Sequence, residues 1–445
     1  MTTRIAGHLL VECLIAQGVT HAFGVPGESY LAVLDGFHAH ADHIRFITNR
    51  QEGGAAFMAD AQGKLTGRPG VCFVTRGPGA TNASIGLHTA FQDSTPMVLF
   101  VGDVASDARD REAFQEVDFA VFFGPSTKGM AKRVERIDDA RRIPEYVARA
   151  FATAMNGRPR PVVLALPEDM LTQVVETDPP PRLEPAQSWA DSGAPRQLRQ
   201  LLLAPERPIL LAGGGGWTPQ SAGALQRFAE NWQLPVTNAF RFQDTFDNHH
   251  PLYAGDVGLG INPALAQRVR ESDLLIAIGP RLGESTTSGY TLIEAPLPKQ
   301  KLVHIHASAE ELGRVYQPTL AICATMNAAA RSLEVLTAPP TLPWADWAAA
   351  CHADYLANVD VGNGGIQLPG RVDMPAIIHT LQAHLPADAV LTNGAGNFAS
   401  WLHRFYRYPG LARGHKTQLA PTNGAMGYGV PAGIAASILT GRTVF

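Results

Sequence analysis

The chain is poor in cysteine. It has four cysteines in 445 residues, Cys13, Cys72, Cys323 and Cys351, and no two of them form a CxxC pair. Cysteines this far apart argue against a disulfide framework and against a zinc site. Because proteins without disulfides are typical of reducing compartments, we expect a cytoplasmic protein.

Long hydrophobic runs are also missing. The longest apolar runs, such as residues 97–101 and 274–278, have the length of strands and are bounded by Gly, Pro or a charged residue. A membrane-spanning helix needs about 20 apolar residues, so we expect no membrane partner. Residues 5–17 carry apolar side chains at helical spacing, but His8 and Glu12 lie among them. This pattern is typical of a surface helix and not of a secretory signal.

No charge of one sign predominates. The chain has 36 Lys and Arg against 40 Asp and Glu, and the basic residues form no run or stripe. Proteins that bind nucleic acids usually carry a clustered basic surface. We therefore exclude nucleic acid as a partner.

The order of apolar runs predicts an α/β protein of three domains. The length suits about three domains of ~150 residues each. In the first domain, expected at 1–175, short apolar runs alternate with segments long enough for helices, which predicts a parallel sheet with helices on both faces. The expected strands of this domain are 22–25, 44–48, 70–75, 96–102 and 161–166.

Two further α/β domains are expected after a Pro-rich linker at 177–195. The central domain is expected at 196–336, with strands at 208–212, 235–238, 273–279 and 301–305. The third is expected at 374–445, with a helix at 375–384 and a strand at 389–392. Two strands would leave an unpaired hydrophobic edge, so we expect the third domain to be incomplete and the natural protein to be longer.

One carboxylate stands out as a candidate catalytic group. In NRQEGGAAFMAD (residues 49–60), Glu52 lies where a strand gives way to a helix rich in Gly, Ala, Phe and Met. Taken alone, a Glu at a helix start is usually a capping group or a group that interacts with the helix dipole. Its role therefore depends on the motifs around it.

Those motifs resemble a known family. They are FGVPGES (23–29), RGPGATN (76–82), AFQDSTP (90–96), AFQE (113–116) and GRPRPVVLALPEDM (157–170). With Glu52, their order and spacing closely resemble the pyrimidine-binding domain of thiamine diphosphate enzymes of the acetolactate (acetohydroxyacid) synthase superfamily. The resemblance implies a three-domain architecture of parallel sheets flanked by helices, with the third domain truncated here.

The resemblance assigns Glu52 to the cofactor's pyrimidine ring. In the family this glutamate is hydrogen-bonded to N1′ and drives formation of the imino group that removes the thiazolium proton. It further implies cofactor-binding roles for Pro26, Gly27, Thr75, Gly79 and Asn82. Residues 77–82 are expected to form a Gly-rich turn, and taken alone such a turn is as consistent with a plain turn as with a binding loop.

Three other positions match residues that line the approach to the thiazolium, namely Phe91, Gln115 and Lys128. Taken singly, an aromatic residue near a helix end is more often part of the core, and a lone lysine is usually a solvated surface group.

The third domain matches the family in two places. Gly394, Gly396 and Asn397 match the diphosphate end, and GAMGYGVPAG (424–433) matches the pyrimidine-contact motif. There the Gly424 carbonyl and the Met426 backbone would meet the pyrimidine, and the Met426 side chain would support the bent cofactor. The alternative is a helix N-terminus with a core methionine.

The resemblance also implies an assembly and a metal. Glu52 and Met426 would meet across a two-fold interface, so we expect at least a homodimer, and a tetramer remains an alternative. Mg²⁺ is expected with its ligands beyond Phe445, and no metal ligand is named within this chain.

The sequence of the central domain does not decide whether this chain binds a flavin. In acetolactate synthases this domain carries a flavin adenine dinucleotide, and in many related decarboxylases it does not. Gly214, Gly215 and Arg281 match flavin contacts. Where the synthases continue with Asp-Asp-Arg, this chain has residues 283–285, Gly-Glu-Ser, and so lacks an arginine for the second ketoacid. His304 and His306 share one face of a strand, but we expect packed or hydrogen-bonded histidines and not metal ligands.

The predicted function is decarboxylation of a 2-ketoacid with thiamine diphosphate, followed by carboligation to an acceptor carbonyl. The substituted Ser285 keeps a second candidate open, a non-ligating decarboxylase or an acyltransferase of the same superfamily. A third candidate, from another class, is a catalytically inactive homologue that serves as a binding or assembly partner.

Overall fold

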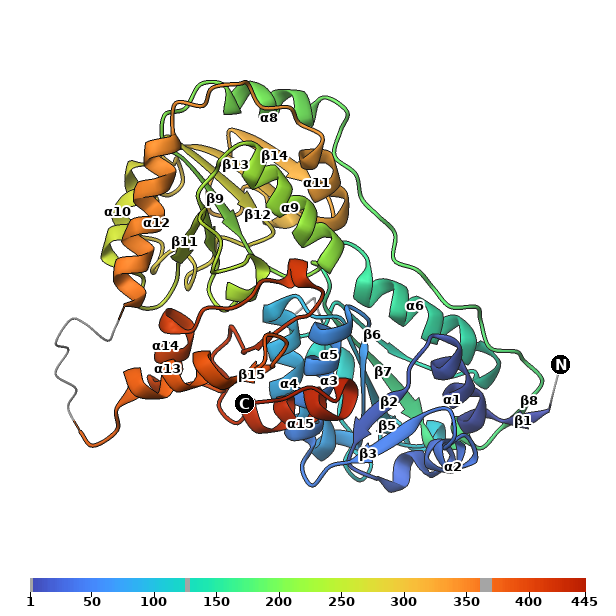
Figure 1. Ribbon diagram of the computed structural model, residues 1–445. Coiled ribbons are helices and arrows are strands. Elements are labelled where there is room, and N and C mark those ends of the chain that lie inside the picture. Colours follow the sequence, from blue (N-terminus) through green and yellow to red (C-terminus); the bar gives the residue numbers. More distant parts are fainter. Residues whose placement is uncertain (1–2, 125–128, 361–369) are drawn as a thin grey trace. The chain divides into compact units, whose positions relative to one another are not determined.

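The computed structural model describes residues 3–124, 129–360 and 370–445 and is an α/β structure with two six-stranded parallel sheets (Figure 1). The predicted fold class is confirmed. The chain divides into two compact units. Unit 1 comprises Met1–Ala186 and Gly427–Gly441, and unit 2 comprises Gln187–Met426 and Arg442–Phe445. The three domain boundaries inferred from the sequence stay a prediction.

The sheet of unit 1 has the strand order β3-β2-β4-β5-β7-β6. Its strands are β2 (His21–Gly24), β3 (Arg45–Thr48), β4 (Gly70–Thr75), β5 (Met97–Asp103), β6 (Arg133–Arg136) and β7 (Pro161–Pro167). All five strands expected in this part of the chain are present. The sequence did not indicate β6, because its residues RVER are mostly charged, as is common at a sheet edge. A short antiparallel pair, β1 (Arg4–Ile5) with β8 (Val174–Val175), lies outside this sheet.

Helices cover both faces of this sheet (Figure 1). One face packs on α1 (Ala6–Ala16), α2 (Leu31–Ala39) and α6 (Ile143–Met155). The other packs on α3 (Glu52–Thr66) and α4 (Arg76–Asp93), and α15 (Gly429–Thr440) packs on α3. Two short helices, α5 (Phe119–Phe123) and α7 (Glu168–Leu171), complete the unit. The helices α3 and α4 approach closely, since a Cβ at Gly86 would lie 2.4 Å from the Cβ of Ala56.

The sheet of unit 2 has the strand order β11-β10-β9-β12-β13-β14 and is parallel throughout. Its strands are β9 (Pro208–Ala212), β10 (Val236–Asn238), β11 (Tyr253–Asp256), β12 (Leu274–Ile278), β13 (Lys301–His306) and β14 (Leu320–Cys323). The four expected strands are present, and the sequence did not indicate β11 and β14, which are short edge strands.

Helices also cover both faces of this second sheet. One face packs on α8 (Ala194–Leu202), α9 (Pro219–Asn231) and α11 (Met326–Glu334), and the other on α10 (Pro263–Glu271). Helix α12 (Ala345–Val359) packs on the edge strand β11.

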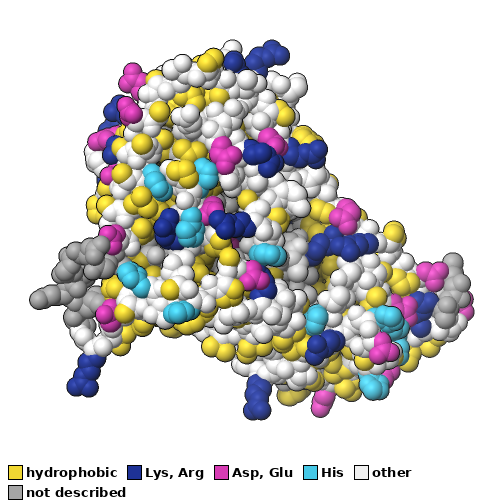
Figure 2. Space-filling model, viewed as in Figure 1, with side chains coloured by type: hydrophobic (Ala, Val, Ile, Leu, Met, Phe, Trp, Pro, Cys, Tyr) yellow, Lys and Arg dark blue, Asp and Glu magenta, His cyan; other side chains and the backbone are white. Residues whose placement is uncertain are grey.

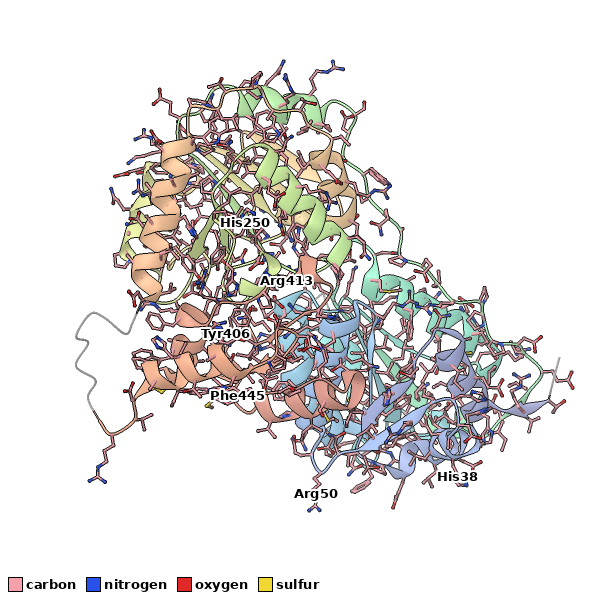
Figure 3. All side chains as sticks on the ribbon, in the orientation of Figure 1. His38, Arg50, His250, Tyr406, Arg413 and Phe445 are labelled. Atoms are coloured by element: carbon pink, nitrogen blue, oxygen red, sulfur yellow. The ribbon has the colours of Figure 1, made fainter. Side chains whose placement is uncertain are left out.

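The last part of unit 2 is small. It contains α13 (Met374–His384), β15 (Leu391–Thr392), α14 (Phe398–Phe405) and β16 (Gln418–Leu419). The expected helix and strand are both present, and β15 pairs in parallel with β16. Tyr406 belongs to the small apolar cluster between α13 and α14, whereas Arg413 pairs with Asp247 at 2.7 Å (Figure 3).

Within the described ranges, no helix combines the length and the apolar character needed to cross a membrane. On the face shown in Figure 2, basic and acidic side chains are interspersed.

Candidate active site

Glu52 is the first residue of α3, and its carboxylate is half-buried. The helix is capped by the preceding residue, since the side chain of Gln51 accepts a hydrogen bond from the Gly54 amide at 3.0 Å. Asn82 on α4 donates from Nδ2 to Oε2 of Glu52 at 3.0 Å. Arg50, two residues earlier, is exposed and projects away from the unit (Figure 3). The capping role considered for Glu52 therefore belongs to Gln51.

Buried groups of the sheet lie near Glu52. Burial raises the pKa of the Cys72 thiol far above its ordinary value, and the charge of Glu52 raises it further. Burial, with smaller contributions from Cys72 and Glu52, likewise raises the pKa of Tyr30. The charge of Glu52 therefore reaches groups that are buried in the sheet.

The two glycines after Glu52 have different surroundings. A Cβ at Gly53 would lie 2.8 Å from Oε1 of Gln51 and 3.2 Å from the carbonyl oxygen of Asn82. A Cβ at Gly54 would meet no other atom within 4 Å. Gly53 is thus needed for packing inside the unit, whereas no other part of the chain packs against the Gly54 position.

The residues expected to bind the cofactor beside this helix are partly brought together. Gly27 packs on Thr75, where an added Cβ would lie 2.5 Å from the Thr75 Cβ. The Thr75 hydroxyl is hydrogen-bonded to that of Ser29 at 2.7 Å, and Pro26 is exposed. Gly79 packs on Val74.

The Gly-rich turn expected at 77–82 is instead the start of a helix. Helix α4 begins at Arg76, directly after β4 ends at Thr75. The Gly77 amide donates to the carbonyl oxygen of Gln115 at 2.9 Å, and Pro78 lacks an amide hydrogen, so this first turn has few unsatisfied donors. Gln115 has a positive φ of 66°.

Phe91 lies away from Asn82, the partner of Glu52. It follows Asn82 by nine residues on α4, which corresponds to about 13 Å along the helix axis. Its ring lies under the guanidinium of Arg160, with 4.1 Å between the guanidinium carbon and the ring centroid. Lys128, the third residue expected to line the thiazolium, lies outside the described residues.

The remaining predicted cofactor residues belong to unit 2. Gly396 has a φ of +140°, and Asn397 directly precedes α14 without a capping hydrogen bond from its side chain. The Gly394 carbonyl accepts a hydrogen bond from the Asn393 side chain at 2.7 Å. Met426 is 81 % exposed, which excludes the core-methionine alternative. Gly424 has a φ of +70°, so the loop depends on glycine there.

A buried charged cluster joins three helices of unit 1. We name it the Lys64 cluster, and it consists of Asp60 and Lys64 on α3, Asp93 on α4, and Tyr428 just before α15. Lys64 Nζ lies 2.8 Å from Asp60 and 2.5 Å from Asp93, and the Tyr428 hydroxyl donates to Asp60 at 2.8 Å. Burial alone would lower the pKa of Lys64, but the two carboxylates outweigh it and raise that pKa well above its ordinary value.

The central sheet places its predicted residues at strand ends. Gly214 and Gly215 follow β9, and Arg281 follows β12 and forms no ion pair with another described residue. The packed alternative holds for the two histidines, since His304 Nε2 is 2.9 Å from the Pro280 carbonyl oxygen and His306 is bonded to Ser308. In the part of the chain that the structure covers, no three His, Cys, Asp or Glu side chains are grouped to hold a metal.

Two family profiles match this chain. The profile described as "Thiamine pyrophosphate enzyme, N-terminal TPP binding domain" covers residues 4–121, and "Thiamine pyrophosphate enzyme, central domain" covers residues 196–333. Thiamine pyrophosphate is another name for thiamine diphosphate.

The curated relatives agree with these profiles. The acetolactate synthase large subunit of Corynebacterium glutamicum is 30% identical over 438 residues, which cover 96% of this chain and 67% of the relative. That of Lactococcus lactis is 30% identical, covering 97% of this chain and 73% of the relative. The isozyme 1 large subunit of Escherichia coli is 29% identical, covering 96% and 74%. This chain belongs to the thiamine diphosphate enzymes of the acetolactate synthase type.

The pyrimidine side of a thiamine diphosphate site fits the residues of unit 1. Glu52 is a half-buried residue at the start of α3, and an added Cβ at Gly54, two residues later on the same helix, would meet nothing. Asn82 holds one carboxylate oxygen, and no other hydrogen bond to this carboxylate occurs among the described residues. A thiamine diphosphate enzyme needs such an acid, with space for a flat ring next to it.

Two features of this acetolactate synthase-like chain were not predicted from the sequence. The hydrogen bond from Asn82 to Glu52 joins residues 30 positions apart, and no local pattern signals it. The Lys64 cluster had a partial signal, because Asp60 and Lys64 are spaced as an i,i+4 pair on a helix. Its other two members come from distant segments.

Proposed function

We propose that the protein decarboxylates a 2-ketoacid with thiamine diphosphate and joins the remaining acyl unit to an acceptor carbonyl, as the names of its acetolactate synthase relatives suggest. The observation that carries the proposal is the carboxylate of Glu52 at the start of α3, which accepts a hydrogen bond from Asn82. When bound, thiamine diphosphate supplies an electron sink for the pair left by the departing CO₂.

Residues of this chain would position the cofactor and hold the proton that its pyrimidine ring needs. Glu52 would hold a proton against the pyrimidine ring, and Asn82 would keep its carboxyl group in one orientation. Gly54 would allow the ring to approach. The exposed Met426 and the Gly424 loop would contact the pyrimidine from another subunit.

The assembly and the metal belong to the same proposal. We take the enzyme to be at least a homodimer, with each active site shared between two chains, and to use Mg²⁺ at the diphosphate. The family resemblance supports both. A reducing cytoplasm suits the four cysteines, which are all free.

Product analysis tests the proposal. Full-length protein with thiamine diphosphate and Mg²⁺ is incubated with a panel of 2-ketoacids, and CO₂ and carbon products are identified by mass spectrometry and NMR. We expect CO₂ release and a product with a new carbon–carbon bond, both dependent on thiamine diphosphate. No CO₂ from any ketoacid would refute the proposal.

A non-ligating decarboxylase is the second candidate. Ser285 stands where the family resemblance predicts an arginine for the acceptor carboxylate, so other residues would have to bind a ketoacid acceptor. An aldehyde as the sole product of the panel would favour this candidate.

A further inference from the structure

The central sheet has the topology of a dinucleotide-binding fold. β9 comes first in the chain, and the sheet continues from it through β10 to β11 on one side and through β12 to β14 on the other. The strand order therefore reverses between β9 and β12, which pair in register from Pro208 opposite Leu274 to Ala212 opposite Ile278. In such sheets a dinucleotide binds in the crevice beyond the carboxyl ends of these two strands.

In this chain the two turns that would border the crevice touch each other. Gly214 and Gly279 have φ values of +74° and +89°. A Cβ at Gly214 would lie 2.1 Å from the carbonyl oxygen of Gly279, and a Cβ at Gly279 would lie 2.1 Å from the carbonyl oxygen of Gly213. The backbones of the two turns are therefore in contact where β9 and β12 end.

Two side chains lie on top of this contact. Trp217 donates from Nε1 to the carbonyl oxygen of Gly213 at 2.8 Å. A Cβ at Gly279 would lie 3.2 Å from this nitrogen and 2.9 Å from the sulfur of Met326. The indole and the thioether thus lie against the Gly279 position, and the indole also contacts the Gly213 carbonyl.

The helix that would receive a pyrophosphate is already capped. Helix α9 begins at Pro219, which has no amide hydrogen to offer. Thr218 and Ser221 form a reciprocal capping box, and the Thr218 hydroxyl also donates to Asn327 at 2.8 Å. The amides of Thr218 and Ser221, two of the donors that could bind a phosphate at this terminus, are therefore already hydrogen-bonded within the protein.

We infer that unit 2 binds no flavin adenine dinucleotide, because Trp217, Met326 and the capped start of α9 occupy the place of the dinucleotide. Arg281 supplies a positive charge near the same strand ends, but a charge does not create the space that a pyrophosphate and its two nucleosides need. The inference does not depend on the proposed function, since related decarboxylases work without flavin.

Calorimetric titration tests the inference. Purified full-length protein is titrated with flavin adenine dinucleotide, with ADP as the shorter ligand that shares its pyrophosphate, and separately with thiamine diphosphate and Mg²⁺. We expect saturable binding of thiamine diphosphate alone, and no saturable heat with the other two up to about 100 µM. Saturable binding of either adenine ligand, or a stoichiometric flavin absorbance in the purified protein, would overturn it. Failure of thiamine diphosphate to bind would count against the proposed function only.

A second measurement tests whether Trp217 is a packed part of the crevice. Trp217→Ala is compared with Trp189→Ala, whose indole is 53 % exposed in the same unit. We expect Trp217→Ala to lower Tm by at least about 3 °C and Trp189→Ala to lower it less. Equal Tm values for Trp217→Ala and wild type would mean that the indole is free to leave, and would overturn the inference.

Discussion

At the scale of single residues, the proposed pyrimidine site depends on two features of α3, the carboxylate of Glu52 and the absence of a side chain at Gly54. Glu52 has its carboxylate held by one hydrogen bond, and Gly54 faces no atom of the chain. Neither feature stabilises the fold strongly, so we expect substitutions at these two positions to change activity more than the free energy of unfolding.

Glu52→Gln removes the acid while keeping the side-chain shape. We expect steady-state turnover of the ketoacid substrate to fall by a factor on the order of 10² or more, because a glutamine cannot hold the proton that the pyrimidine ring needs. Glu310→Gln, at an exposed position of unit 2, is the control and should keep wild-type turnover. Equal turnover of Glu52→Gln and wild type would remove Glu52 from the chemistry.

Gly54→Ala adds one methyl group to the open space. The fold should tolerate it, because the new Cβ meets no atom of the chain and alanine is the better helix former. We expect an unchanged or higher Tm, together with binding of thiamine diphosphate weakened by about tenfold or more through the clash with the ring.

Gly86→Ala is the matched control for this variant. Its Cβ would lie 2.4 Å from that of Ala56, so α3 and α4 would have to separate. We expect a loss of about 1–3 kcal/mol of unfolding free energy from overpacking. Full cofactor affinity in Gly54→Ala would show that the pyrimidine lies elsewhere.

At the scale of elements, the Lys64 cluster is the main polar connection between α3, α4 and the start of α15. Asp60, Asp93 and Lys64 are all nearly inaccessible to solvent, and Tyr428 is fully buried. A buried charge without its partner is far more costly than a surface charge. The cluster should therefore matter for stability more than the exposed ion pairs of the chain.

Lys64→Met tests this expectation. The substitution keeps the length and the apolar stem but leaves two carboxylates without a cation, so we expect a loss of about 3–5 kcal/mol in urea-induced unfolding. Lys299→Met, at a position whose side chain is 74% exposed, should cost less than about 1 kcal/mol. The double variant Asp60→Asn/Lys64→Met should recover part of the loss, and additive losses would contradict the proposed coupling.

A second buried polar network connects β11 to α14 and β16 in unit 2. Asp256 accepts a hydrogen bond from Gln243 at 3.1 Å, Gln418 donates to Gln243 at 2.6 Å, and Gln418 is 3.0 Å from Nδ1 of His403. Burial raises the pKa of Asp256 to about 7, although Gln243 and Arg404 oppose the shift. Burial lowers the pKa of His403 to about 3.

Asp256→Asn should make the stability of unit 2 less dependent on pH. A carboxyl whose pKa is raised on folding contributes stability below its unfolded pKa of about 4 and loses it as the pH rises towards 7. Asparagine stays neutral, so the variant's unfolding free energy should rise relative to wild type between pH 5 and pH 8, by on the order of 1–3 kcal/mol.

The unfolding free energy of the wild type is subtracted from that of the variant at each pH. Both proteins lose stability on acidification because of His403, so this contribution cancels in the difference. Asp346→Asn, an exposed position on α12, is the control and should track wild type. A constant difference from pH 5 to pH 8 would contradict the raised pKa of Asp256.

At the scale of the whole molecule, the proposal requires each active site to draw on two chains. Glu52→Gln and Met426→Ala would then damage different halves of a site. Co-expression of the two variants should restore activity to about a quarter of wild type, because half of randomly formed dimers are mixed and each mixed dimer has one intact site. Activity no higher than that of the separate variants would argue for a site built within one chain.

Much of the fold could be predicted from local patterns. Strands β4, β5 and β7 are buried on both faces, so their apolar runs are continuous and easily recognised. Strand β6, with the residues RVER, was missed because an edge strand needs no such run. The turn expected at Gly77 proved to be the first turn of α4, since Gln115 from a distant loop satisfies the Gly77 amide.

The sequence by itself determined the fold class, most strands and the choice of Glu52, because these depend on residue type and spacing along a short stretch. Only the tertiary structure decided that Gln51 and not Glu52 caps α3, that Met426 lies on the surface, and that the Trp217 indole donates a hydrogen bond to the Gly213 carbonyl after β9. Each of these depends on which distant atoms meet. Spacing along the chain sets the periodicity of an element, but the contacts of a side chain are set by how the elements pack.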